Sequence, residues 1–317
     1  MKKTNILVTG GAGFIGSATA LKLSENSSNL VVVIDNLLTG HVDNLAAGKT
    51  RKNLVFIKED VNNVKEVSDI FARYSFDYVF HYAAIVGVQR TLANPILVLN
   101  DISGLKNIMS LSKNTGVKRI FFSSSSEVYG EPVELPQNEH TTPLNSRLPY
   151  AIVKNVGEAY LKSYKKEFGM DYTIFRFFNT YGPAQSREFV ISKFISRALR
   201  HEDITIYGDG RQTRTFCFIE DNVEACLNAF EKNMFINDVV NIGSAEEISI
   251  LDLARKVVAL TGSKSEIIFL PPLDEGDMSR RNPDNNKMLK LLNRELVDLD
   301  EGIQRILEKS FYLLAQK

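Results

Sequence analysis

Two short stretches carry the side chains best suited to acid–base chemistry. The run Ser123-Ser124-Ser125-Ser126-Glu127 directly follows an apolar segment that predicts a strand, and Tyr150 stands four residues before Lys154. Residues four apart are neighbours on one face of a helix, so the phenol and the ammonium would lie side by side. Taken alone, the serines could simply end a strand, and the Tyr–Lys pair could lie on the surface. Taken together, they could form the acid–base site of an enzyme.

A glycine-rich loop follows the first predicted strand. Gly10, Gly13 and Gly16 permit a tight turn, close approach of the backbone to a pyrophosphate, and close packing of a helix on the strand. The helix after Gly13 would offer free N–H groups to phosphate. Asp35 ends the second predicted strand, 19 residues beyond Gly16, where an acid suits a ribose with both hydroxyls. The pattern favours NAD over NADP, although a turn without a ligand would also use these glycines.

Apolar runs and amphipathic stretches alternate along the first half of the chain. Strands are predicted over 5–9, 30–34, 55–58, 78–81, 119–123 and 172–177, and helices over 14–24, 64–74, 96–114 and 150–168. This alternation predicts a doubly wound α/β fold with a parallel sheet. Asp60 and Val61 follow the third strand, where they could meet an adenine, or Asp60 could simply cap the strand. Beyond residue 178 the pattern becomes less regular and indicates a smaller lobe.

The composition is that of an ordinary globular protein, with 44% hydrophobic and 24% charged residues among 317. Basic and acidic residues number 38 each, so no net charge favours nucleic acid or an anionic membrane as a partner. Cys217 and Cys226 cannot build a disulfide framework, and no apolar run approaches the ~20 residues of a membrane span. The histidines lack the spacing of metal ligands. We expect a cytoplasmic protein without a metal site.

Ordered motifs along essentially the whole chain resemble the short-chain dehydrogenase/reductase superfamily, in particular its extended branch that modifies nucleotide sugars. In chain order they are TGGAGFIGS from Thr9, DNLLTG from Asp35, HYAA from His81, SSSSEVYGEP from Ser123, YAIVK from Tyr150, RFFNTYGP from Arg176, GDGRQTRTFCFIED from Gly208 and RRNPD from Arg280. The resemblance implies a Rossmann-type NAD-binding domain over residues 1–178, completed by segments around 215–243. It also implies a mixed α/β lobe over residues 179–317, which mainly binds a nucleotide sugar.

The resemblance assigns roles to individual residues. It implies that Tyr150 is the catalytic base, that Lys154 favours the phenolate and holds the nicotinamide ribose, and that Ser125 hydrogen-bonds the reacting hydroxyl. Glu127 is a further catalytic candidate. Further cofactor contacts are expected from Phe14, Ile15, Asn36, Asp60, Val61, Ala83, Ala84, Asn100, Ser123 and Phe177. Substrate contacts are expected from Ser126, Arg147, Asn179, Val190, Tyr207, Arg214 and Arg281, of which the last two would hold the diphosphate.

Three reactions share the implied first step, which is oxidation of a sugar at C4 by bound NAD. Glu127 in its SSEVYG setting and Arg147 resemble UDP-glucuronate decarboxylases, whereas YAIVK and AAIVGVQRTLANP look more like 4-epimerases. The chain has no tryptophan and so lacks the usual carboxy-terminal Gly-Trp-x-Pro, which also counts against the decarboxylase. We predict one of these two activities on a UDP-sugar, with a 4,6-dehydratase as the alternative. A non-catalytic NAD-binding regulator is a remote further alternative. Members of this branch usually dimerise through the helices that match 96–114 and 150–168, so a homodimer is expected.

Overall fold

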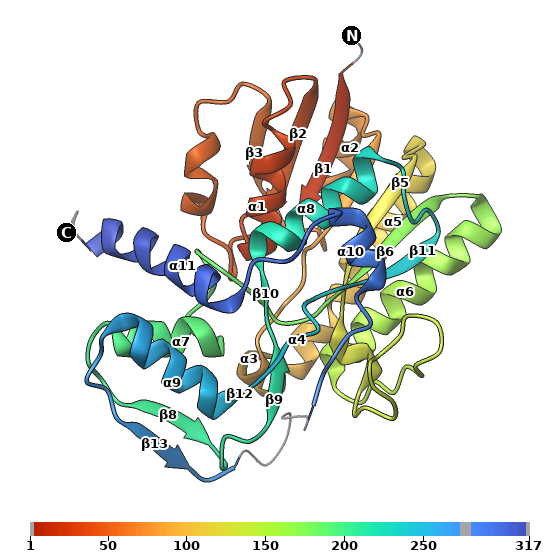
Figure 1. Cartoon of the computed structure of the whole chain (residues 1–317). Helices are drawn as coiled ribbons and strands as arrows, with labels where there is room; N and C mark the ends of the chain where they lie inside the picture. Colours follow the sequence, from red (N-terminus) through yellow and green to blue (C-terminus); the bar gives the residue numbers. More distant parts are fainter. Residues whose placement is uncertain (1–2, 273–279, 315–317) are drawn as a thin grey trace. The chain divides into compact units, whose positions relative to one another are not determined.

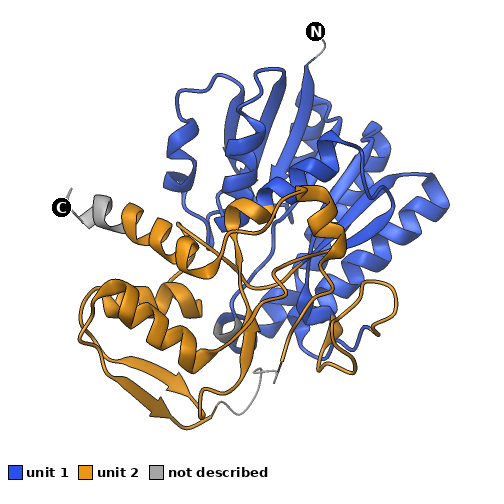
Figure 2. Cartoon of the chain, viewed as in Figure 1, with its two compact units in different colours: residues 1–128, 144–176, 223–240 blue, residues 129–143, 177–222, 241–317 orange. Residues whose placement is uncertain are grey.

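The computed structural model describes residues 3–272 and 280–314, and the chain divides into two compact units (Figures 1 and 2). Unit 1 comprises residues 1–128, 144–176 and 223–240, drawn in blue in Figure 2. Unit 2 comprises residues 129–143, 177–222 and 241–317, drawn in orange. Each unit therefore combines segments that are far apart in the sequence. Within the described ranges, no helix is both long and apolar enough to cross a membrane.

Unit 1 is built on a seven-stranded sheet with the strand order β11-β6-β5-β4-β1-β2-β3 (Figure 1). The strands are β1 (Thr4–Thr9), β2 (Asn29–Asp35), β3 (Leu54–Lys58), β4 (Tyr78–His81), β5 (Arg119–Ser125), β6 (Asp171–Phe177) and β11 (Asp238–Ile242). The pairs β1–β2, β1–β4, β2–β3 and β4–β5 are parallel. The strand order reverses between β1 and β4, and doubly wound sheets bind their ligands beyond the carboxyl ends of the strands at such a point.

Helices pack on both faces of this sheet. They are α1 (Phe14–Leu23), α2 (Val64–Tyr74), α3 (Val88–Ala93), α4 (Pro95–Leu99), α5 (Asp101–Thr115), α6 (Pro149–Phe168) and α8 (Ile219–Glu231), with a 3₁₀ helix at Val42–Gly48. On β5, Ile120 and Phe122 belong to a core cluster with residues of α2, α5 and α6. Phe121 points to the other face, where its ring centroid lies 5.7 Å from that of Phe230 in α8. Successive side chains of the strand are thus buried on opposite faces of the sheet, which explains the continuous apolar runs of the sequence.

The predicted helix over 96–114 is wrong in one respect, because the structure divides it into α4 and α5 at Asn100. The N–H of Ser103 donates to the oxygen of Asn100, three residues back instead of four, at 3.0 Å. Such a bond tightens the turn and ends the regular α-helical pattern. The break makes Asp101 the first residue of α5. The strand predicted over 119–123 extends to Ser125, which carries two more serines into the sheet.

Unit 2 is a mixed α/β unit in which the described strands form two-stranded sheets. Their members are β7 (Thr180–Tyr181) with β10 (Cys217–Phe218), β9 (Thr213–Thr215) with β12 (Glu247–Ser249), and β8 (Ile204–Tyr207) with β13 (Ile267–Leu270). The β9–β12 pair is antiparallel and the other two pairs are parallel. Its helices are α7 (Val190–Ala198), α9 (Ile250–Thr261), α10 (Asn286–Leu292) and α11 (Leu299–Leu314), and α9 packs against both α7 and α11.

Candidate active site

The glycine loop lies at the point where the strand order reverses. Gly10 has a φ of +66°, and a Cβ on it would lie 2.6 Å from the backbone nitrogen of Ala83 in the loop after β4. A Cβ on Gly16 would lie 2.2 Å from the oxygen of Gly10, so α1 packs directly on the turn. Both positions exclude a side chain, which leaves backbone N–H groups exposed to a ligand at the start of α1. Gly13 is the N-cap and supplies no side-chain cap to the first turn.

Asp35 ends β2 beside this loop. One carboxylate oxygen accepts the N–H of Ala12 at 3.0 Å, and the other accepts the N–H of Leu37 at 2.8 Å. The side chain is therefore fixed next to the glycine turn, with lone pairs left for ribose hydroxyls. A negative charge at this place also disfavours a 2′-phosphate, so the residues present fit NAD better than NADP.

Asp60 follows β3 and acts as a local cap. Its carboxylate accepts the N–H of Asn62 at 2.8 Å and the side-chain amide of Asn36 at 2.9 Å. The bond from Asn36 connects the segments that follow β2 and β3. Asp60 thus has the strand-cap role, and contact of Asp60 and Val61 with an adenine stays a prediction.

His81 connects the ends of β1 and β4 from within the core. Its Nδ1 lies 2.7 Å from the hydroxyl of Thr9, which also accepts the N–H of Ala83 at 3.3 Å. The Thr9 hydroxyl thus joins the His81 ring to the backbone of Ala83. Burial, together with the charge of Lys154, lowers the pKa of His81 to about 3. The imidazole is therefore neutral and positions the loop after β4.

The three serines at the end of β5 each have a different partner. Lys154 donates to the hydroxyl of Ser123 at 3.2 Å, and Ser124 donates to the carboxylate of Glu158 at 2.7 Å. Ser125 accepts the N–H of Glu127 at 3.2 Å and keeps its proton free to donate. The strand end is thus tied to α6 at two points, while Ser125 is turned into the following 3₁₀ helix, Ser126–Tyr129.

Lys154 is 3% exposed, and its ammonium lies 5.1 Å from the ring centroid of Phe122 and 5.7 Å from that of Tyr150. Burial lowers the pKa of Lys154 to about 8, and the negative charge of Asp101 opposes the fall. Tyr150 is partly buried and packs against Ile85 and Val153. The structure therefore brings the ammonium of Lys154 close to the phenol ring of Tyr150 and to the hydroxyl of Ser123.

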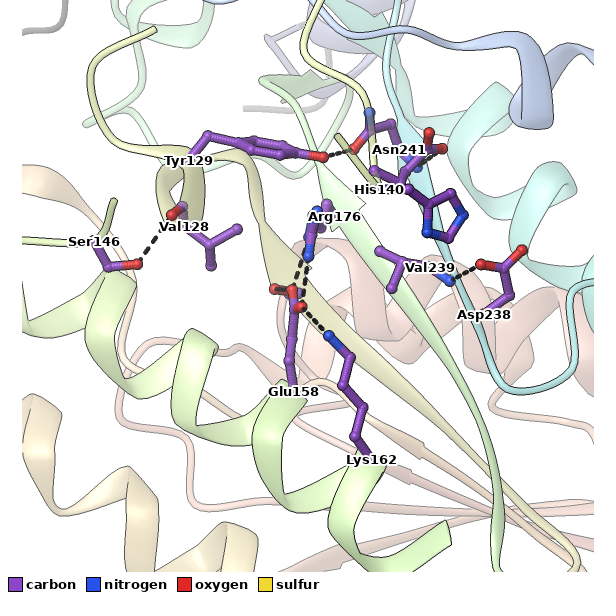
Figure 3. Close-up of polar contacts among 12 residues, drawn as sticks. Val128, Tyr129, His140, Ser146, Glu158, Lys162, Arg176, Asp238, Val239 and Asn241 are labelled. Carbon is purple, nitrogen blue, oxygen red and sulfur yellow. Dashed lines mark hydrogen bonds and ion pairs between the residues drawn. The ribbon is translucent and has the colours of Figure 1, made fainter. Parts of the chain in front are cut away.

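Glu158 lies one helical turn beyond Lys154 and is 1% exposed. Figure 3 shows its side chain with those of Arg176 and Lys162. It accepts two hydrogen bonds from Arg176 of β6, from Nε at 2.8 Å and from Nη2 at 2.7 Å. Lys162, one further turn along α6, lies 3.7 Å from the same carboxylate. Burial alone would raise the pKa of Glu158, but Arg176, Ser124 and Lys162 together lower it. The carboxylate is charged and joins α6, β5 and β6 beneath the candidate site.

The remaining candidates after β5 differ in exposure. Ser126 is 2% exposed, Glu127 is half-buried and Arg147 is exposed. Ser146 donates to the oxygen of Val128 at 3.0 Å, which holds the segment before α6 against the end of the 3₁₀ helix (Figure 3). Arg147 and Glu127 therefore belong to segments in contact.

The predicted substrate residues of unit 2 lie on several of its elements. Asn179 donates to the oxygen of Thr215 at 3.0 Å, and the ammonium of Lys193 lies 5.4 Å from the ring centroid of Tyr207. Val190 begins α7.

Arg214 and Arg281 lie on segments that Glu247 joins. Thr213, just before Arg214, donates to Glu247 at 2.8 Å, and Arg280, just before Arg281, pairs with the same carboxylate at 2.6 Å. The bonds from Arg280 are the main reason that the pKa of Glu247 falls to about 2.

Known proteins resemble this chain over nearly its full length. Residues 6–243 match the model of the NAD dependent epimerase/dehydratase family. The chain belongs to this family. The putative UDP-glucose 4-epimerase of Methanocaldococcus jannaschii is 36% identical over 306 residues, which cover 95% of this chain and 96% of that protein. UDP-glucuronic acid decarboxylase 1 of Danio rerio is 35% identical over 314 residues, 96% of this chain and 72% of the relative. The crystal structure of the UDP-glucose 4-epimerase from Thermotoga maritima with UDP-glucose has a TM-score of 0.91 and 35% identity, covering 98% of this chain and 100% of that one.

Membership of the epimerase/dehydratase family confirms several predictions. The family, the Rossmann-type sheet, the enzyme class with NAD as cofactor, and the modification of nucleotide sugars are as the sequence predicted. The roles of the individual residues and the boundary after residue 178 stay predictions.

Four residues of this epimerase/dehydratase chain that shape the site were not predicted from sequence. They are His81, Asp101, Glu158 and Glu247. Glu158 was open to prediction, because it continues the four-residue spacing of Tyr150 and Lys154 along α6. The others depend on contacts between segments distant in the sequence, and no local pattern marks them.

Proposed function

We propose that the chain is an NAD-dependent UDP-sugar 4-epimerase. The observation that carries the proposal is the position of Lys154, whose buried ammonium donates to Ser123 and lies over the ring of Tyr150. A cation so close to the phenol favours the phenolate, which can then accept a proton near neutral pH. Oxidation of an alcohol requires such a base, and the structure supports this role for Tyr150.

The chain's own residues would act in a simple sequence. Ser125 binds the C4 hydroxyl of the sugar, and the phenolate oxygen of Tyr150 takes the hydroxyl proton. NAD, which the glycine loop and Asp35 would hold, would supply the hydride acceptor for C4 and the source of the returned hydride. The 4-keto sugar then rotates in the site and presents its other face. Tyr150 gives its proton back to the C4 oxygen, so protons and electrons balance over the cycle. The ammonium of Lys154 favours the phenolate form of Tyr150 at each stage.

An epimerase needs no further acid or base, and the residues around Tyr150 supply what it needs. Arg214 and Arg281 would hold the diphosphate of the UDP-sugar through their guanidinium groups. The putative UDP-glucose 4-epimerase from M. jannaschii and the UDP-glucose 4-epimerase from T. maritima also match the chain over nearly their whole lengths. These agreements support epimerase chemistry.

A UDP-glucuronate decarboxylase is the second candidate, and Arg147 favours it. The side chain of Arg147 is exposed three residues before Tyr150, where it could bind the carboxylate of a uronic acid. Oxidation at C4 would turn C6 into a β-keto carboxylate, which loses CO2 readily. A 4,6-dehydratase would need Glu127 to serve in a second proton transfer at C5 and C6, and this is the weaker alternative.

The reaction is tested with the purified protein and NAD⁺. UDP-glucose, UDP-GlcNAc, UDP-glucuronate and dTDP-glucose are supplied separately, and the products are identified by mass spectrometry and NMR. An isomer of unchanged mass supports the epimerase, whereas loss of CO2 from UDP-glucuronate without any isomer overturns it in favour of the decarboxylase. Loss of water selects the dehydratase. Tyr150→Phe serves as the matched control, because it removes one hydroxyl and keeps the ring that packs against Ile85.

We also propose that the protein is a homodimer located in the cytoplasm. Exposed apolar residues on the helices expected to form the contact support a dimer; they are Ile96, Leu97 and Leu99 of α4 and Ile152 of α6, with Ile96 71% exposed. Light scattering coupled to size-exclusion chromatography would give the mass of the particle, and a monomer at micromolar concentration would contradict the proposal.

A further inference from the structure

Asp101 lies at the break between α4 and α5, close to the candidate site. Its carboxylate accepts the backbone N–H of Ile85 at 2.8 Å. Ile85 belongs to the loop after β4, the loop whose earlier residue Ala83 lies against Gly10. A carboxylate from the first turn of α5 thus fixes the loop at the point where the strand order of the sheet reverses.

The loop fixed by Asp101 is also a packing surface for the catalytic helix. Ile85, Val98 and Val153 form a small buried cluster, and Tyr150 and Ile102 pack against it. Val153 and Tyr150 both come from α6. A shift of the Ile85 backbone would therefore move the surface on which the Tyr150 ring rests.

The carboxylate of Asp101 also has an electrostatic role, because Lys154 is a buried cation with few charged groups around it. His81 of β4 is neutral, and Ser123 of β5 offers a hydroxyl without a net charge. Tyr150, on the same helix, is the group whose proton is to be exchanged. Glu158 is the nearest carboxylate along α6, but Ser124 and both donors of Arg176 occupy it.

Asp101 supplies the opposite charge. Burial raises the pKa of Asp101, and the Ile85 N–H and the Lys154 charge counteract that rise, while Asp60 adds to it. For Lys154 the balance is the reverse, since burial lowers its pKa and Asp101 raises it. Each group therefore favours the charged form of the other.

We propose that Asp101 is a positioning residue of the active site, which holds the Ile85 loop against Tyr150 and balances the buried ammonium of Lys154. The inference rests on the function proposed above for Tyr150 and Lys154. An acid in the first turn of a helix is common for other reasons, since it complements the helix dipole. Asp101 differs from such an acid because it binds a residue of another loop and interacts with a buried cation.

Removal of the Asp101 charge has a defined consequence. The pKa of Lys154 is about 8 in the protein. Without a nearby negative charge, burial acts unopposed, and the ammonium loses its proton at lower pH. Since the cationic form of Lys154 supports the Tyr150 phenolate, the alkaline limb of the activity profile should move to lower pH.

The test is an NMR titration of the protein without NAD, in which lysines carry ¹³C at the ε position. Comparison with Lys154→Met identifies the Lys154 signal. In Asp101→Asn the amide oxygen can still accept the Ile85 N–H, so the charge changes and the loop contact stays. We expect the pKa of Lys154 to fall below its value of about 8. Glu167→Gln, which removes one exposed carboxylate from α6, is the matched control and should leave it unchanged.

An unchanged Lys154 pKa in Asp101→Asn would overturn the proposal. Asp101→Ser, which removes the charge with a smaller side chain, gives the same comparison if Asp101→Asn fails to fold. The titration does not depend on substrate, so its outcome is separate from the proposed function. The pKa of Lys154 could shift as expected while Tyr150→Phe keeps full turnover. That result would support the charge interaction of Asp101 with Lys154 and contradict the catalytic roles of Tyr150 and Lys154.

Discussion

Replacement of Arg176 by methionine should destabilise unit 1 strongly and in a pH-dependent way. The change leaves the Glu158 carboxylate 1% exposed and without its two hydrogen bonds from the guanidinium, at 2.7 and 2.8 Å. Ser124 still donates, and Lys162 remains 3.7 Å away but is half-exposed. Removal of one partner of a buried ion pair costs about 3–5 kcal/mol, and the remaining donors favour the lower end, about 3 kcal/mol at pH 7.

The sign of the pH dependence follows from the pKa of Glu158. In the native protein this pKa is lowered, so the stabilisation is present above the unfolded value of about 4.3 and is lost as the pH falls through the folded value. In Arg176→Met, burial is opposed only by Ser124 and Lys162, so the pKa of Glu158 rises. The protonated form then fits the site, so the variant regains stability as the pH falls towards about 4. The difference between the two proteins should therefore shrink at acid pH.

Urea unfolding followed by circular dichroism at pH 7 and pH 5 measures the effect as a shift of the midpoint. The double variant Arg176→Met/Glu158→Gln is the control, because it removes both charges and leaves neutral groups of similar size. We expect it to be more stable at pH 7 than Arg176→Met alone. A single variant that loses less than about 1 kcal/mol at pH 7, or a double variant that is less stable than the single one, would refute the reasoning.

Three further predictions concern the candidate site. Tyr150→Phe should reduce turnover by about 10²–10⁴-fold with little change in UDP-sugar binding, measured by steady-state kinetics and calorimetry; normal turnover would contradict the base assignment. Gly16→Ala should weaken NAD binding about tenfold or more, because the new Cβ would lie 2.2 Å from the oxygen of Gly10. Calorimetric titration with NAD⁺ measures the affinity, and an unchanged affinity would count against the close packing of α1. Glu247→Gln should raise KM for the UDP-sugar several-fold with kcat nearly unchanged, since Glu247 joins the segments that carry Arg214 and Arg281. Replacement of the exposed Asp252 by Asn is the control, and a loss confined to kcat would exclude this role of Glu247.

The sequence predicted the sheet well because its strands bury both faces. Continuous apolar runs such as that before Ser123 are typical of parallel strands under helices on each side, and the loops at the strand ends carried recognisable glycines and serines. Asn100 shows where this reasoning failed. Local propensity continues the helix through it, whereas the tertiary contact of Asp101 with Ile85 accompanies a break.

The candidate site was predicted to the extent that its residues follow one another at helical or strand spacing. Tyr150 and Lys154 share a helix, and their partner Ser123 ends a neighbouring strand. Glu247 illustrates the opposite case, because its partners Thr213 and Arg280 are more than 30 residues away in either direction. No pattern in the sequence of β12 distinguishes this glutamate from an exposed one.

The three consecutive serines at the end of β5 illustrate how one residue type can take different roles at successive positions. Ser123 binds the ammonium of Lys154, and Ser124 binds the carboxylate of Glu158, one turn further along α6. Two serines thus fix the strand to two successive turns of the helix that carries Tyr150. Ser125, the next residue, is left to donate its proton elsewhere. Because Ser124 is held by the ion pair of Glu158 and Arg176, the stability of that pair also affects how the end of β5 is held against α6. A variant that breaks the pair but still folds should therefore lose turnover more than it loses affinity for the UDP-sugar.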